Sequence, residues 1–291
     1  MKKITMKKIL KLIIMFMIIS IFAFGSTRSI ASFNTLHLGW KSDHRQEKIE
    51  GLASIISSFD LIGIQEVMKK DEVKKLTNEL KAQTGIEWRY HISPYAVGSK
   101  KYREYFAYLY RTDRVKLLKK GKFYPEVDRG HNFMREPYGA KFQMGDFKFT
   151  YVLVHSIFGK KKTERQLEGM QMVDVYDWFK EEYDKNNKEN IVIIGGDFNI
   201  PSYDDAFSGF LKHSDMIVDA IPPNQKTTIG KSGLVSSYDH IFYPYELMQG
   251  WYTGRNGILD FTDNNYREIR KVISDHLPVF IEVNTVKDEG E

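Results

Sequence analysis

The pattern of apolar and polar residues predicts alternating strands and helices in the first third of the chain. Apolar runs at 29–38 and 60–67 predict strands, and each is followed by a predicted helix, at 45–58 and 71–83. In the first of these helices the apolar residues share one face at helical spacing, whereas the second is rich in charge. Strand–helix–strand–helix order is typical of parallel pairing, so we expect the first two strands to be parallel neighbours.

The rest of the sequence predicts more strands and a single long helix at 162–184. Gly145 and Asp146 are expected to close a hairpin. No Gly/Ser/Pro-rich linker or internal repeat divides the sequence, so one domain is expected over 26–291. Mixed strands with helices in two groups favour an α/β fold of two packed sheets, each covered on its outer side. The additional strands are predicted at 87–91, 105–111, 115–119, 138–144, 147–155, 191–194, 238–243, 248–253 and 277–283.

Residues 1–25 predict a signal peptide rather than part of the fold. Five lysines precede the uncharged run 12–24, which is too short to span a bilayer comfortably, and small residues follow it. Cleavage after Gly25 is favoured over cleavage after Ala31, because the later cut would trim the first strand; an uncleaved anchor is the alternative. We therefore expect an exported, secreted protein, with a periplasmic or surface-tethered location as the alternatives.

Charge and cysteine content limit the classes of function. The five lysines of residues 1–25, with no acidic residue among them, account for the whole net charge of +5. Overall basicity is therefore no argument for nucleic-acid binding. The chain has no cysteine, which excludes disulfides, zinc–thiolate sites and a lipid anchor on cysteine.

Polar residues at the ends of apolar strands mark the candidate site. After Ile191 to Ile194, two glycines let the backbone pass close to a neighbour, and Asp197 and Asn199 then project to the same side. Taken alone, such a stretch fits a simple turn equally well. Its recurrence predicts an oxygen-rich site for a hard divalent cation, with histidines suited to acid–base chemistry near neutral pH. The other strand-end residues are Asn34, Glu66, His155, Asp239, Asp275 and His276.

Several of these segments resemble the signature blocks of the endonuclease/exonuclease/phosphatase superfamily. The blocks are Gln65-Glu66, Gly196-Asp197-Phe198-Asn199 and Ser274-Asp275-His276-Leu277-Pro278-Val279. Within the superfamily, the chain resembles the deoxyribonuclease I family. Residues 102–111 are similar to its Tyr-x-Glu strand, 133–137 to its Arg-Glu-Pro segment and 153–156 to its catalytic histidine strand. The resemblance implies a four-layer α/β/β/α sandwich with the site at one edge.

The resemblance also implies metal-assisted hydrolysis of a phosphodiester. Glu66 is the first metal ligand, with Asp197 and Asp275 as further ligands. Mg²⁺ is the expected ion, Mn²⁺ is an alternative, and Ca²⁺ is a further option as a structural or activating ion.

Proton transfer is assigned by the resemblance to two histidine–carboxylate pairs. His276 resembles the general base, poised by Asp239, and His155 resembles the general acid, supported by Glu104; the acid and base labels are interchangeable. Each carboxylate is expected to raise the pKa of its histidine. The resemblance further implies that Asn199 assists Asp197 in orienting metal and phosphate, and that Asn34, Tyr102 and Arg135 contact the substrate.

The implied substrate is DNA, contacted non-specifically through its backbone by a monomer with no protein partner. A sphingomyelinase or another lipid or inositol phosphoesterase is the alternative within the same fold, and a non-enzymatic binding module is a third hypothesis. The loop 260–265 is expected to be a plain hydrophilic loop. No function is assigned to the histidines at positions 37, 44, 91, 131, 213 and 240.

Overall fold

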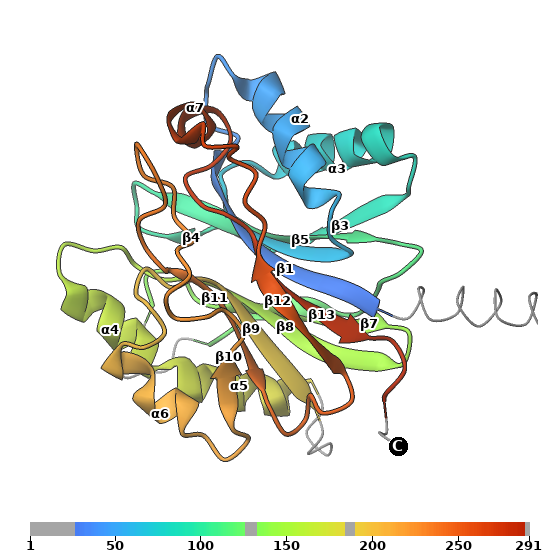
Figure 1. Ribbon diagram of the computed structural model, residues 1–291, viewed down its shortest axis with the longest axis vertical. Coiled ribbons are helices and arrows are strands. Elements are labelled where there is room, and N and C mark those ends of the chain that lie inside the picture. Colours follow the sequence, from blue (N-terminus) through green and yellow to red (C-terminus); the bar gives the residue numbers. More distant parts are fainter. Residues whose placement is uncertain (1–26, 126–132, 184–189, 289–291) are drawn as a thin grey trace, which may run out of the picture.

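Two β-sheets pack face to face, with helices on both outer sides (Figure 1). The computed structural model describes residues 27–125, 133–183 and 190–288, so the expected signal peptide at 1–25 lies outside the described residues. The layers are those of the predicted four-layer α/β/β/α sandwich, and the fold class is confirmed.

The first sheet has the strand order β12-β13-β1-β2-β5-β3, and β4 pairs with β5. β1 and β2 are parallel, as predicted, with Ile30 opposite Leu61, and the other pairs of this sheet are antiparallel. Its strands are β1 (Thr27–Leu38), β2 (Leu61–Val67), β3 (Trp88–Ile92), β4 (Val97–Gly98), β5 (Arg103–Arg111), β12 (Tyr252–Ile258) and β13 (Val279–Asn284).

The second sheet has the strand order β10-β11-β9-β8-β7-β6. β8 and β9 are parallel, and β7 and β8 form the predicted hairpin around Gly145 and Asp146. Its strands are β6 (Lys116–Phe123), β7 (Tyr138–Met144), β8 (Phe147–His155), β9 (Ile191–Asp197), β10 (Ile217–Asp219) and β11 (Asp239–Pro244).

The helices form the two outer layers, each sealed by its own apolar cluster. α2 (Arg45–Ile56) and α3 (Lys70–Thr84) cover the first sheet, and α7 (Tyr266–Val272) packs beside α2 (Figure 1). The second sheet is covered by α4 (Lys162–Met170), α5 (Met172–Glu182), the 3₁₀ turn η1 (Asp205–Phe207) and α6 (Ser208–Leu211). No helix within the described ranges is long and apolar enough to cross a membrane.

The core between the sheets is aromatic and fixes how the two sheets sit against each other. Tyr108, Tyr138 and Tyr151 are fully buried there. The Tyr151 hydroxyl on β8 donates to the carbonyl oxygen of Ala31 on β1, at 2.7 Å. This bond satisfies a buried polar group and connects the two sheets close to the strand ends that carry the candidate site.

Two predicted elements were wrong. The predicted helix at 162–184 is broken at Gln171, whose N–H bonds to the oxygen of Glu168, three residues back, instead of continuing the ladder. Gly169, a poor helix former, precedes this break. The predicted strand at 248–253 begins only at Tyr252, because 245–251 forms turns that include Gly250 at φ +76°. The loop at 260–265 is a loop, but the helix α7 that follows it was missed.

Candidate active site

Three neighbouring strands of the second sheet place His155, Asp197 and Asp239 side by side. His155 ends β8 and is paired with Asp197 at the end of β9, and Asp239 at the start of antiparallel β11 is paired with the same Asp197. Gly196 makes this spacing possible, since a Cβ there would lie 1.9 Å from the carbonyl oxygen of Val154 on β8. The sequence predicted that the two glycines let the backbone pass close to a neighbour, and that neighbour is the adjacent strand β8.

The first sheet contributes Asn34 and Glu66 from irregular ends of β1 and β2. The strand register shifts near both residues, and Glu66 has a left-handed backbone at φ +60°. The Asn34 amide donates to Glu66 Oε1 at 3.1 Å and to Asp197 Oδ2 at 3.2 Å. Asn34 therefore links the carboxylates of the two sheets, so that the site lies where the two strand-end edges meet.

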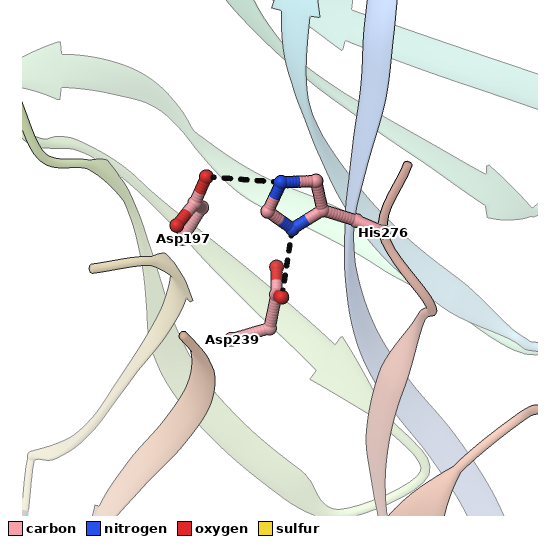
Figure 2. A group of neighbouring side chains, drawn as sticks. All are labelled: Asp197, Asp239 and His276. Carbon is pink, nitrogen blue, oxygen red and sulfur yellow. Dashed lines mark hydrogen bonds and ion pairs between the residues drawn. The ribbon is translucent and has the colours of Figure 1, made fainter. Parts of the chain in front are cut away.

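His276 precedes β13 and forms the first histidine–carboxylate pair. Figure 2 shows its ring between two carboxylates: Nδ1 lies 2.8 Å from Asp239 Oδ2, and Nε2 lies 3.5 Å from Asp197 Oδ2. Thr227 Oγ1 donates to the same oxygen of Asp239 at 2.7 Å. Burial alone would lower the pKa of His276, but the charges of Asp239 and Asp197 outweigh it and raise the pKa well above its usual value.

His155 forms the second pair. Its Nδ1 lies 2.7 Å from Glu104 Oε1, and its Nε2 lies 3.7 Å from Asp197 Oδ2. Glu104 is fully buried and also pairs with Arg135, at 2.9 Å from Nε to Oε2, so it is not a surface residue. Burial disfavours the charged imidazole, but the carboxylate of Glu104 prevails over burial and over Arg135, and the pKa of His155 is raised.

Glu66 is ionised in this environment. Burial would raise its pKa, but the nearby His155 and His37 and the amide of Asn34 hold the pKa at about 2. The His37 backbone N–H donates to Glu66 Oε2 at 2.9 Å. In contrast, burial and the neighbouring Asp239 raise the pKa of Asp197 despite the opposing charges of His276 and His155.

Eight of the eleven predicted site residues line one cleft of about 520 Å³. The other three support it from behind: Asn34, Glu104 and Asp239 are buried against the residues that line it. Asn199 uses its amide nitrogen internally, donating to the Ser156 carbonyl at 2.9 Å. The eight lining residues are Glu66, Tyr102, Arg135, His155, Asp197, Asn199, Asp275 and His276.

The sequence profile of the endonuclease/exonuclease/phosphatase family matches residues 31–276. The chain belongs to this family. A deoxyribonuclease of Thioalkalivibrio sp. (strain K90mix) is 28% identical over 274 residues, covering 89% of this chain and 72% of that protein. Mouse deoxyribonuclease-1 is 25% identical over 284 residues, covering 92% of this chain and 96% of that protein.

Solved structures show the same fold. A family member from Bacteroides thetaiotaomicron superposes with a TM-score of 0.61 at 19% identity, covering 90% of this chain and 99% of that one. A mannosyl-6-phosphatase of the same organism superposes with a TM-score of 0.59 at 19% identity, covering 88% and 99%. The family is one of hydrolases that act on phosphate esters, and these two relatives of the chain are named deoxyribonucleases.

Family members generally depend on a divalent metal, and the site fits one. Carboxylate oxygens of Glu66, Asp197 and Asp275 face one cleft, an arrangement of hard ligands that suits a cation such as Mg²⁺. Asp197, Asp239 and His276 also place ligand atoms within 4.8 Å of one another. His276 and Asp239 already bind each other, so the Glu66 side of Asp197 is the better position for the ion.

The cleft also contains residues that the sequence did not indicate. Arg270 lies on α7, the missed helix, and its guanidinium is 3.6 Å from the carboxylate of Asp275. His37, left without a function, contacts Glu66 through its ring at 3.2 Å. One feature of the site is visible only in the structure: Glu66 and Asn199, neither of which is glycine, have a left-handed backbone conformation.

The other histidines without an assigned function serve structural contacts where they are described. His91 accepts the N–H of Gly121 at 2.8 Å, and His240 pairs with Asp219 at 2.8 Å. His44 and His213 pair with surface acids, Glu47 and Asp177. His131 lies outside the described residues.

Proposed function

We propose that this protein is a metal-dependent phosphodiesterase that hydrolyses DNA as a non-specific endonuclease. The observation that carries the proposal is the convergence of two buried histidine–carboxylate pairs on one oxygen, Asp197 Oδ2, inside an acidic cleft. Two relatives named deoxyribonucleases, one of which matches along nearly its whole length, support DNA as the substrate.

The two histidines supply the proton transfers. In its neutral form, His276 Nε2 removes a proton from the attacking water, while Asp239 holds Nδ1–H and stabilises the ring as it becomes charged. His155 Nε2 protonates the leaving oxygen, and Glu104 holds its Nδ1 in the same way. Both Nε2 atoms face the same carboxylate oxygen, so one phosphate group can contact both; exchanging the acid and base labels leaves this geometry unchanged.

The cation would be held by Glu66 and Asp197, with Asp275 as a third ligand, and Mg²⁺ is the proposed ion, Mn²⁺ an alternative and Ca²⁺ an activating or structural option. When bound, it neutralises phosphate charge and assists attack by water. The protein's own groups complete phosphate binding. Arg135 offers forked donors next to Tyr102, whose pKa is raised by burial and by Glu66, so the phenol stays neutral and can donate.

A lipid phosphodiester is the second candidate substrate, and the rim of the cleft favours it. Phe158 and Val235 line the cleft and are 62% and 55% exposed, which suits contact with an apolar surface. Turnover of DNA (single-stranded and duplex), RNA and sphingomyelin by the purified protein separates the two. We expect the fastest turnover on DNA; faster turnover of sphingomyelin would replace the first proposal with the second.

We further propose that the protein is exported, is cleaved after Gly25 and acts as a monomer without a protein partner. Support comes from β1, because Thr27 to Ala31 pair with β13 and a cut after Ala31 would remove them from the sheet. Mass spectrometry of the protein recovered outside the cell should find residue 26 at its N-terminus. A chain that keeps residues 1–25 would indicate an anchor.

A further inference from the structure

Three aromatic rings form a stack beside the catalytic cleft. The rings of His37 and Trp40 are parallel with centroids 4.0 Å apart, and Tyr102 meets both edge-on, at 5.5 and 5.7 Å. His37 covers one side of the indole, yet Trp40 remains 47% exposed. The stack therefore presents a flat aromatic surface to solvent next to a residue, Tyr102, that lines the cleft.

The backbone that carries this surface has an unfavourable conformation that hydrogen bonds hold in place. Leu36 and His37 are consecutive left-handed residues, at φ +47° and +56°, a conformation that is unfavourable for residues other than glycine. Four hydrogen bonds hold them. Asn34 Oδ1 accepts from Leu36 N at 3.0 Å, and Lys48 Nζ donates to Leu36 O at 2.7 Å.

The other two bonds connect the turn to the site and to the indole. Glu66 Oε2 accepts from the His37 backbone N–H at 2.9 Å, and the Trp40 N–H bonds back to the His37 carbonyl at 3.0 Å. The exposed Trp40 is thus held at a fixed position relative to Glu66, a proposed metal ligand, through His37. Solvent exposure alone requires no such fixing, so the arrangement points to a bound partner for the ring.

Beyond Trp40 lies a second, smaller cleft of about 170 Å³. His37 and Trp40 form part of its wall, and the exposed cationic side chains of Lys41 and Lys271 form another part. A DNA strand with one backbone phosphate in the catalytic cleft would pass the indole on its way to these lysines.

We propose that Trp40 stacks on an unpaired nucleobase that flanks the phosphate being cut, and that Lys41 and Lys271 attract the next phosphate. Exposed aromatic side chains stack on bases without regard to their identity, which fits non-specific cleavage. In a duplex, both faces of a base are already covered by its neighbours, so the site takes single-stranded or locally opened DNA. This inference rests on the proposed function and specifies the form of its substrate.

Cleavage of two oligomers tests the stacking. One is oligothymidylate, and the other is an oligomer of the same length built from abasic deoxyribose phosphates. Relative to the wild type, Trp40→Ala should lower the ratio of kcat/KM for oligothymidylate to that for the abasic oligomer by about tenfold, the size expected for losing one base–aromatic stack. Trp40→Phe should keep most of the ratio. An unchanged ratio in Trp40→Ala overturns the proposal.

Tyr245→Ala is the matched control, since Tyr245 is 45% exposed but follows the end of β11 opposite to Asp239. Its ratio should equal that of the wild type, and a fall of similar size in this variant would also overturn the proposal. A titration with oligothymidylate in chelator needs no turnover: tryptophan fluorescence should be quenched in the wild type and not in Trp40→Phe. If the wild type cuts no nucleic acid, the proposed function fails, and the presence or absence of this quench then decides the stacking site separately.

Discussion

Replacing Asp239 by asparagine tests the His276 pair without changing its shape. Asp239 Oδ2 lies 2.8 Å from His276 Nδ1 and accepts from Thr227 Oγ1 at 2.7 Å. The Thr227 hydroxyl oxygen itself accepts two backbone N–H groups, from Tyr238 and Asp239, so its proton remains directed at residue 239. An asparagine would therefore turn its carbonyl oxygen towards Thr227 and His276, and the variant loses chiefly the negative charge.

The loss of that charge determines how far kcat is expected to fall. A unit charge about 4 Å from the centre of an imidazolium contributes about 4 kcal/mol at an effective dielectric constant near 20. General acid–base catalysis as a whole is worth about 10² to 10⁴ in rate. We expect Asp239→Asn to lower kcat on DNA by about 10² to 10³ and His276→Ala to lower it by at least about 10². The double variant should be no slower than His276→Ala, because Asp239 acts through His276.

Steady-state cleavage of DNA at saturating substrate measures these rates, with circular dichroism and thermal unfolding as checks on the fold. Asp219→Asn is the matched control: it removes the carboxylate of another buried histidine pair, with His240, that lies outside the cleft. Its kcat should stay within about threefold of the wild type, below the range of acid–base effects. If kcat of Asp239→Asn stays within fivefold of the wild type, or if the double variant loses the product of both single effects, Asp239 does not act through His276.

Three further predictions follow from buried groups and from substrate charge. His240 is buried with one ring nitrogen 2.8 Å from Asp219 and the other 3.1 Å from a backbone carbonyl; burial opposes its charged form, but Asp219 raises its pKa. This pair therefore stabilises the fold fully below about pH 6.5, the pKa of histidine in the unfolded chain, and the stabilisation is lost as pH rises through the raised pKa of the folded protein. The unfolding free energy of Asp219→Asn should be lower than that of the wild type by more at pH 6 than at pH 9. An equal difference at the two pH values would contradict this prediction. Glu168 is buried and accepts the backbone N–H groups of Met134 and Ile157, at 2.6 and 2.8 Å, beside the segments that carry two proposed site residues. Glu168→Gln should lower stability by about 2 kcal/mol and raise KM more than it lowers kcat, and a variant with wild-type melting temperature would oppose that role. Finally, kcat/KM on DNA should fall steeply as salt rises from about 50 to 200 mM, whereas salt-independent cleavage would argue against backbone phosphate contacts.

The strand ends that carry the chemistry were predictable because apolar runs are easy to recognise and polar residues at their ends stand out. The pairing of His276 with Asp239 and of His155 with Glu104 came from resemblance, since sequence spacing says nothing about which strand ends meet. The structure brings both pairs together and adds the reason for Gly196, whose missing side chain lets β9 approach β8.

Other features depend on information that a sequence pattern does not contain. The left-handed backbone of Leu36 and His37 arises from hydrogen bonds to distant residues, so the position of Trp40 beside the cleft could not be predicted. Arg270 was missed because α7 is short and polar, and its seven residues follow a hydrophilic loop. The break at Gln171 could not be predicted, because the helical spacing of apolar residues continues on both sides of it.

Cleavage of DNA by the purified protein, with and without chelator, tests whether this protein is a metal-dependent deoxyribonuclease. We expect DNA to be cut in the presence of Mg²⁺, chelator to abolish cutting and added Mg²⁺ or Mn²⁺ to restore it, with RNA and sphingomyelin turned over more slowly. Cleavage of DNA that is unaffected by removing divalent ions would contradict metal-dependent hydrolysis.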